Sequence, residues 1–342
     1  MDVQSYLDNQ LKSAGKYQLT PDDEKLLEKG NVDFVVAKLM SKKFRKWKLD
    51  PACIDRTRKA VEIQVKKNLP IKVIFFQGGY KLWRFPTSPE SDWAEFFNLA
   101  YVLNYVAPLA TAYKPGVELI YYCHTLLMET HDNLTTEEIK AYMDSFAHLQ
   151  SEFQKYLPKN IKLSILRDAD IYSRDEYFKA LEEGKVKAEQ DIKSWPEARV
   201  KDFERMATLN IKWNGKEDWS KLSEEGKQEK IHQAALYEQA ATSNLPKVME
   251  MVKSPDTILL FTKASPIFIG IGSTYTSMAK YWVGTGVLQD HKDSFIPRIL
   301  TPSQYEKAMS LKHKSVAVKN GLGKNFKTID LYHEPLQFER HI

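Results

Sequence analysis

Cysteine is nearly absent from this chain of 342 residues, which holds only Cys53 and Cys123. Two thiols without a C-x-x-C spacing are too few for a disulfide framework or a zinc cluster, so we expect no bound metal and a reducing compartment. The amino terminus lacks the apolar core of a signal peptide, and no uninterrupted apolar run approaches the roughly 20 residues of a membrane helix. These absences favour a soluble, cytoplasmic protein without a membrane anchor.

A strong charge of either sign is also missing. Lys and Arg number 50 against 45 for Asp and Glu, which gives a formal net charge of +5 and a pI near 8.8. This small excess suits anionic metabolites and falls below the signature of a nucleic-acid-binding protein. The basic run from Lys42 to Lys48 includes Phe44 and Trp47, and we interpret it as a solvated helix face with two core anchors. Small-molecule partners are therefore expected, nucleic acid is disfavoured, and the oligomeric state is left open.

What the chain does have is hydrophobic content, 43% of its residues, which is enough to bury a full core. Apolar runs at Val73–Phe76, Val117–Cys123 and Ile161–Leu166 predict strands, and segments with helical spacing near Ser91–Tyr113 and Thr135–Tyr156 separate them. Such alternation favours right-handed crossovers and a parallel sheet that is covered on both faces. The predicted fold class is α/β, a Rossmann-like three-layer fold with a mostly parallel sheet.

The chain is predicted to divide into two parts. Residues 1–70 have the pattern of an amino-terminal helical cap, and residues 71–342 would form the α/β domain. A strongly charged stretch at about 173–252 is predicted to be a helical insertion with a solvated outer face. Strand composition then returns in short segments that would give the sheet a mixed edge: Thr257–Thr262, Ile267–Ile271, Ser315–Val318 and Thr328–Tyr332.

The loop after the first strand carries the densest group of functional side chains. Gly78 and Gly79 precede Lys81, Trp83 and Arg84. Ligands of α/β sheets bind at the carboxyl ends of strands, and a lysine point charge beside an arginine fork suits an anion. Lys81 is therefore a candidate catalytic residue, and Arg84 and Trp83 are candidates for substrate binding. The alternatives are two surface cations that flank a turn and an aromatic ring that belongs to the core.

Titratable residues follow on the next elements. Asp92 and Glu95 lie at the start of a helix, and Glu95 is a candidate proton shuttle, although acidic residues there also complement the helix dipole. His124 follows the second strand and is a candidate catalytic group, with a structural histidine as the alternative. Arg167 follows the third strand and is a candidate for substrate binding, unless it simply pairs with Asp168.

A second candidate anion site lies near the later strands. Lys263 is followed by Gly270, Gly272, Ser273 and Thr274. Glycines after a strand permit close approach of the backbone, and the lysine, hydroxyls and successive amides could bind a phosphate. The sequence lacks a full P-loop and a full G-x-G-x-x-G, so nucleotide binding is weakly indicated and no cofactor is expected. The alternative is a turn or bulge rich in small residues.

Several short motifs stand in a fixed order over residues 60–166. They are Leu69-Pro70-Ile71, Tyr80-Lys81, Pro86-Thr87-Ser88-Pro89, Asp92 with Glu95, Tyr113-Lys114-Pro115-Gly116, and Thr135 to Tyr142. In this order and spacing the chain resembles the isocyanide (isonitrile) synthases of the pyoverdine and dityrosine biosynthesis family. The carboxyl-terminal strands match that family only loosely. One departure is local, because Cys123-His124-Thr125 stands where the family usually has Ser-Asp-Gly.

The resemblance implies an enzyme of lyase or transferase type that acts without metal or nucleotide. It would condense the amine of an amino acid with the ketone of ribulose 5-phosphate, whose C2 becomes the isonitrile carbon. The acid missing after the second strand favours an alternative, a non-catalytic or divergent small-molecule-binding protein of the same fold. A third hypothesis is a nucleotide-dependent transferase that uses the Gly270 loop.

Overall fold

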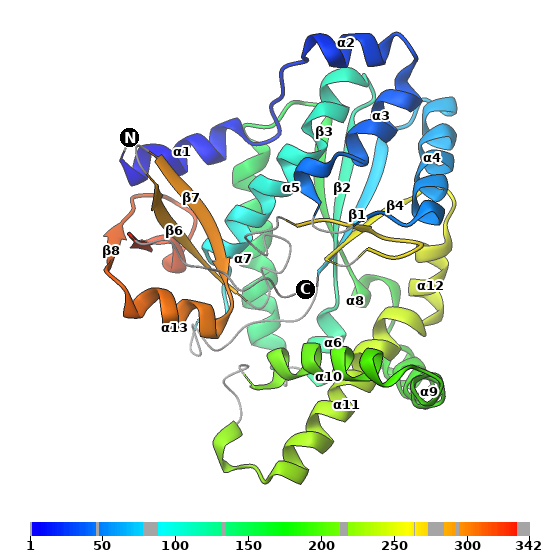
Figure 1. Ribbon diagram of the computed structural model, residues 1–342, viewed down its shortest axis with the longest axis vertical. Coiled ribbons are helices and arrows are strands. Elements are labelled where there is room, and N and C mark those ends of the chain that lie inside the picture. Colours follow the sequence, from blue (N-terminus) through cyan, green and yellow to red (C-terminus); the bar gives the residue numbers. More distant parts are fainter. Residues whose placement is uncertain are drawn as a thin grey trace.

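Figure 1 shows the computed structural model, in which two sheets lie side by side and helices surround the larger one. The structure describes residues 2–45, 48–77, 88–130, 134–212, 218–262, 264–272, 284–291 and 294–333. Among these residues, no helix is both long enough and apolar enough to cross a bilayer.

The larger sheet has five strands, and every pair of neighbours is parallel. Its spatial order is β3-β2-β1-β4-β5. The strands are β1 (Ile71–Gln77), β2 (Val117–Cys123), β3 (Ile161–Arg167), β4 (Ile258–Phe261) and β5 (Ile269–Gly270). The predicted α/β class with a parallel sheet is confirmed, because each apolar run of the sequence forms a strand of this sheet.

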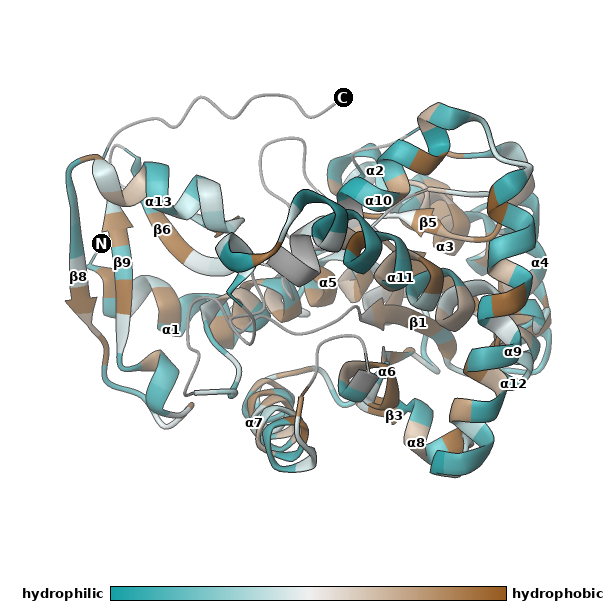
Figure 2. Ribbon diagram, turned by 90° about the horizontal axis from the view of Figure 1, so that it is seen from below, coloured by the Kyte–Doolittle hydropathy of each residue, from teal (hydrophilic) through white to brown (hydrophobic). Residues whose placement is uncertain are grey.

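One face of this sheet carries the amino-terminal helices together with two long crossover helices. The amino-terminal helices are α1 (Val3–Ser13), α2 (Pro21–Leu27), α3 (Asn31–Leu39) and α4 (Pro51–Lys66). The crossover helices are α5 (Trp93–Ala112) and α7 (Thr136–Gln154), and α5 is buried along nearly its whole length. Thr135 and Glu138 form the capping box that the sequence predicts at the start of α7. Figure 2 shows hydrophobic residues concentrated on β1 and α5 in the interior.

The opposite face is covered by helices from the charged stretch near residues 173–252 together with two short helices that follow β2 and β3. The helices on this side of the sheet are α6 (Thr125–Thr130), α8 (Asp168–Ile171), α9 (Arg174–Lys193), α10 (Glu197–Lys212), α11 (Glu224–Ser243) and α12 (Pro246–Lys253). Alternation along β1 separates the two cores, since Phe75 packs with the first set of helices and Phe76 with the second. Helices therefore form where the insertion is expected. That these helices are an insertion separate from the α/β domain stays a prediction, and so does the domain boundary at residue 70.

The four other strands of the described residues form a sheet of their own. They are β6 (Thr285–His291), β7 (Ser294–Leu300), β8 (His313–Ala317) and β9 (Thr328–Tyr332), in the order β7-β6-β9-β8, and α13 (Pro302–Ser310) follows β7. Only β6 and β9 pair in parallel, so the mixed pairing expected of the late strands is present, but it lies in this second sheet. Neither β6 nor β7 is evident from the sequence, because polar residues interrupt the first and Pro297 the second.

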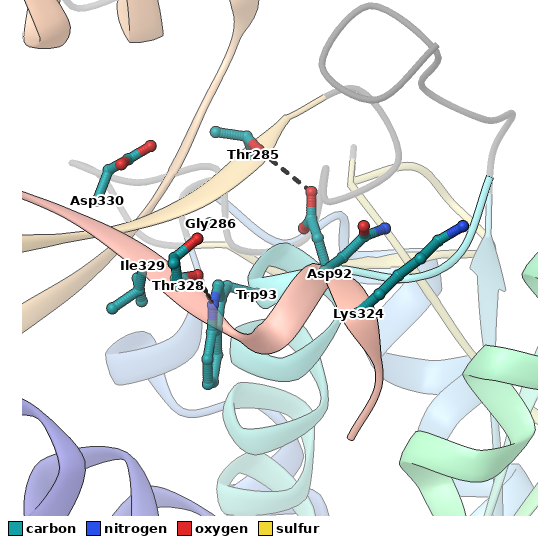
Figure 3. Close-up of a pocket in the computed structure, with 9 residues that line it drawn as sticks. Asp92, Trp93, Thr285, Gly286, Lys324, Thr328, Ile329 and Asp330 are labelled. Carbon is teal, nitrogen blue, oxygen red and sulfur yellow. Dashed lines mark hydrogen bonds between the residues drawn. The ribbon is translucent and has the colours of Figure 1, made fainter. Parts of the chain in front are cut away.

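The second sheet is fixed against the start of α5. Trp93 Nε1 donates a hydrogen bond to the carbonyl of Thr328 at 2.7 Å, and the hydroxyl of Thr285 donates to Asp92 at 3.1 Å. A Cβ atom on Gly286 would lie 2.2 Å from the carbonyl carbon of Trp93, so only glycine permits this approach of the two backbones. The start of α5 is therefore held against the second sheet, and Figure 3 shows the hydrogen bond between Thr285 and Asp92.

Candidate functional site

The structure describes three of the predicted site residues. Glu95 lies in the first turn of α5, His124 follows β2, and Arg167 ends β3. The other predicted site residues lie outside the described residues: Lys81, Trp83, Arg84, Lys263, Ser273 and Thr274.

A buried polar cluster occupies the carboxyl edge of the parallel sheet, where β2 and β3 end. Cys123 and Arg167 are partners in the register of these strands, so the next residues, His124 and Asp168, leave the sheet side by side. Asp168 is fully buried and His124 is 4% exposed. Carboxyl ends of adjacent parallel strands are the usual place for ligand sites in this class of fold.

The carboxylate of Asp168 binds the segment that follows His124. The hydroxyl of Thr125 donates to Asp168 Oδ1 at 2.6 Å, and the amide of Leu126 donates to the two carboxylate oxygens at 3.0 and 3.1 Å. The amide of Ala169 donates as well, at 2.9 Å. Burial raises the pKa of Asp168 to about 6 even though these donors favour its charged form.

His124 lies against aromatic rings and keeps one ring nitrogen open. Its ring is T-shaped to Tyr122, with centroids 4.8 Å apart, and tilted against Phe76 at 6.3 Å. Burial lowers the pKa of His124 to about 4, so the imidazole is neutral near neutral pH. Nδ1 makes no hydrogen bond to any described residue. The site thus holds a neutral imidazole whose Nδ1 is not engaged by the part of the chain that the structure describes.

Two buried phenols complete the cluster. Tyr122 belongs to β2 and Tyr177 to α9, and both are fully buried. Burial, and after it the nearby carboxylate of Asp168, raises the pKa of both phenols, which therefore stay protonated. The oxygen of Tyr122 has no hydrogen-bond partner among the described residues. Unpaired buried polar atoms are costly, so their gathering at one strand edge indicates a functional site.

Glu95 lies on the other face of the sheet and completes a capping box. It accepts the amide of Asp92 at 2.8 Å and the hydroxyl of Tyr142 at 3.3 Å. Tyr142 belongs to the core beneath α5 and α7, whereas Tyr122, the neighbour of His124, belongs to the core on the opposite face. The described contacts therefore do not bring Glu95 and His124 together.

Arg167 is exposed and forms its ion pair with Asp170, not with Asp168. The alternative considered for Arg167, an ion pair with Asp168, is therefore not what the structure shows. Asp168 instead turns into the protein, because the start of α6 offers it a hydroxyl and amide donors. Arg167 therefore lies on the surface beside the carboxyl edge of the sheet, in an ion pair with Asp170.

The described residues also line cavities away from this polar cluster. One, of about 90 Å³, lies where the second sheet meets α5 (Figure 3). Its lining residues are Asp92, Trp93, Thr285, Gly286, Lys324, Asn325, Thr328, Ile329 and Asp330. This volume is below the few hundred cubic ångströms of ordinary metabolite pockets. Another is an open groove of about 610 Å³ between α10 and α11, lined by Glu204, Glu225 and Glu229 together with His232.

Comparison with known proteins adds a fold neighbour. The structure is similar to the crystal structure of the PvcA protein from Pseudomonas aeruginosa, with a TM-score of 0.62 over 89% of this chain and 99% of that one. The two sequences are 15% identical, so the likeness shows the fold alone. No family model and no curated protein sequence matches the chain.

Sequence reasoning missed most of the polar cluster. Tyr122 was taken only as part of an apolar strand, and Tyr177 only as part of the charged insertion. Asp168 was noted only beside Arg167, with a pairing of the two as the alternative to a functional role. The signal that could have found it was positional, because residues 124 and 168 both follow parallel strands that are neighbours in the sheet.

Proposed function

We propose that the protein is an isonitrile synthase-like enzyme that condenses the amine of an amino acid with the ketone of ribulose 5-phosphate. Two findings support this proposal: the motif order over residues 60–166 and a fold that resembles PvcA over almost the full length of both chains. The observation that carries it is the buried, neutral His124 at the carboxyl edge of the sheet, whose Nδ1 is open.

His124 would move protons in this reaction. When the amine attacks the ketone, the nitrogen must lose a proton and the carbonyl oxygen must gain protons to leave as water. A histidine with a pKa of about 4 is a weak base in the free protein. The phosphate of a bound substrate would raise this pKa, since a nearby negative charge stabilises the imidazolium. His124 would then approach the range in which a general base is most effective.

The local departure from the family pattern is compatible with catalysis. The family has an acid after the second strand, where this chain has His124. Asp168 supplies a carboxylate at the same edge from the neighbouring strand, and it bonds directly to Thr125. A polar, titratable site is therefore kept, which argues against a fold that has lost its chemistry. Lys81 and Arg84 remain the proposed ligands of the phosphate, and Glu95 the second candidate for proton transfer.

The described part of the Gly270 loop gives no support to the nucleotide hypothesis. Gly272 has a φ of +142° and donates its amide to the carbonyl of Phe44 at 2.9 Å. That amide is therefore engaged by the protein and is not directed at a phosphate. An enzyme of the isonitrile class is favoured over a transferase that uses this loop.

The test is to incubate the purified protein with ribulose 5-phosphate and each aromatic amino acid in turn. Isonitrile is detected by mass spectrometry or by trapping with a tetrazine. His124→Gln should lower turnover by about 10² to 10⁴, the usual contribution of general acid–base catalysis. His148→Gln is the matched control, because His148 is exposed on α7.

Three outcomes decide among the hypotheses. Product with wild type and its loss in His124→Gln support the proposal. If His124→Gln makes as much product as wild type and Glu95→Gln makes none, Glu95 and not His124 is the residue that transfers protons. Absence of product for every pairing, while one ligand still raises the melting temperature, contradicts an enzyme and favours a binding protein of the same fold.

A further inference from the structure

We infer that Asp168 is a positioning residue for His124, an inference that rests on the proposed role of His124 in proton transfer. Asp168 does not need to touch a substrate in this role. It acts through Thr125 and Leu126, the two residues that follow the histidine.

His124 occupies the N-cap position of α6. Its carbonyl accepts the first bond of that helix, from the amide of Met128 at 3.1 Å. Ser, Thr, Asp or Asn is preferred at an N-cap, because the side-chain oxygen can accept the free amides of the first turn. Histidine has no such oxygen, so α6 lacks a cap from its own sequence.

Asp168 provides the missing cap from another strand. Its carboxylate accepts the amide of Leu126 and the hydroxyl of Thr125, the two residues that directly follow His124. The positive end of the helix dipole further favours a carboxylate at this place. The side chain of His124 is thereby released from capping, and its Nδ1 stays open.

The turn is therefore fixed at both ends. On one side, Cys123 is held in the ladder between β2 and its neighbours. On the other side, Thr125 is held by the buried carboxylate. His124 is the single residue between these two points, so the direction of its ring depends on Asp168. Burying a carboxylate is costly, and a helix of six residues gains little from a cap alone, which favours a functional reason for Asp168.

The experiment follows the imidazole directly in long-range ¹H–¹⁵N spectra of uniformly labelled protein over a range of pH. In the wild type, His124 should titrate with a pKa of about 4. In Asp168→Asn, the side-chain NH₂ opposes the amide of Leu126, the turn opens, and the ring becomes solvated. The pKa of His124 should then rise by at least about one unit toward its ordinary value of 6.5.

Thr125→Val is the second variant, because it breaks one bond to Asp168 without changing any charge. It should raise the pKa of His124 in the same direction by a smaller amount. If Asp168→Asn does not fold, Thr125→Val carries the test alone. Asp50→Asn is the control, since Asp50 caps α4 by accepting the amide of Ala52. It should lower the melting temperature and leave the His124 signals in place.

The inference is overturned if Thr125→Val is folded and the resonances and pKa of His124 do not move. A response in Asp168→Asn alone would make Asp168 an electrostatic neighbour of the ring and would overturn positioning as well. These spectra need no catalytic turnover, so failure of this inference can be distinguished from failure of the proposed function. Where wild type makes isonitrile, Asp168→Asn should lower kcat on the order of 10²-fold, the cost of a misplaced catalytic group, with little change in KM.

Discussion

His124 and Asp168 should make opposite contributions to the dependence of stability on pH. The folded pKa of His124 is about 4, below its ordinary value of 6.5, so the unfolded chain takes up the proton first as pH falls. Stability from a neutral buried histidine is therefore lost as pH falls from about 6.5 to 4. Each pKa unit corresponds to about 1.4 kcal/mol, so the loss should amount to about 3 kcal/mol.

Asp168 works in the other direction. Its folded pKa is about 6, above the ordinary value of 3.8, so the folded protein takes up the proton first. The cost of burying its charge is relieved as pH falls from about 6 to 4, by about 3 kcal/mol on the same scale. In the wild type, the two contributions should largely cancel over this window.

Single variants separate the two contributions. We expect the stability of His124→Gln relative to wild type to be about 3 kcal/mol more favourable at pH 4 than at pH 7. Asp168→Asn should change by a similar amount in the opposite direction. Urea denaturation, monitored by circular dichroism, gives the stability of each variant relative to wild type at both pH values. The contributions of the other carboxylates cancel in these differences. If the free energy of unfolding of both variants changes with pH as that of wild type does, His124 and Asp168 do not have the buried environments described above.

Three further predictions concern the packing that supports the site, and each is measured by urea denaturation. Glu95→Gln keeps an acceptor for the capping box and should lower the free energy of unfolding by about 1 kcal/mol or less. Glu95→Leu removes that acceptor from buried donors and should lower it by about 1 to 3 kcal/mol. Equal losses of stability in the two variants would refute the capping role. Gly286→Ala forces a Cβ into the start of α5 and should cost about 1 to 3 kcal/mol or more, while Gly321→Ala, with open space around its Cβ, should be nearly neutral. Arg56→Met removes hydrogen bonds to carbonyls at and just after the end of α12 and should cost about 1.5 to 3 kcal/mol. Its control is Arg58→Met on the same helix, which breaks only a surface ion pair worth at most about 1 kcal/mol.

The parallel sheet and its crossovers could be predicted from local pattern. The run Val117–Cys123 became β2 without a change at either end, and Thr135 capped α7 as its spacing with Glu138 indicates. These features are local because a buried parallel strand is apolar on both faces and a capping box spans only four residues. Helical segments in the charged stretch near residues 173–252 were predictable for the same reason.

The second sheet could not be predicted in the same way. In β6, only Val287 and Leu288 form an apolar pair among polar residues and glycine, and β7 includes Pro297. β7 pairs with its neighbour β6, while β6 also pairs with β9, which is distant in the chain, and is placed by its contact with α5 through Gly286. Strand formation of this kind depends on the environment more than on intrinsic preference.

The sequence by itself determined which side chains stand at the ends of the strands, because hydrophobic runs bounded by turn residues fix where each strand stops. It placed His124 after β2 and Asp168 after β3 in this way. Only the tertiary structure decided what those residues do. Arg167 turned outward to Asp170, Glu95 became a cap on the far face, and Asp168 turned inward to hold the His124 turn. Such choices depend on burial and on donors from distant segments, which no local spacing records.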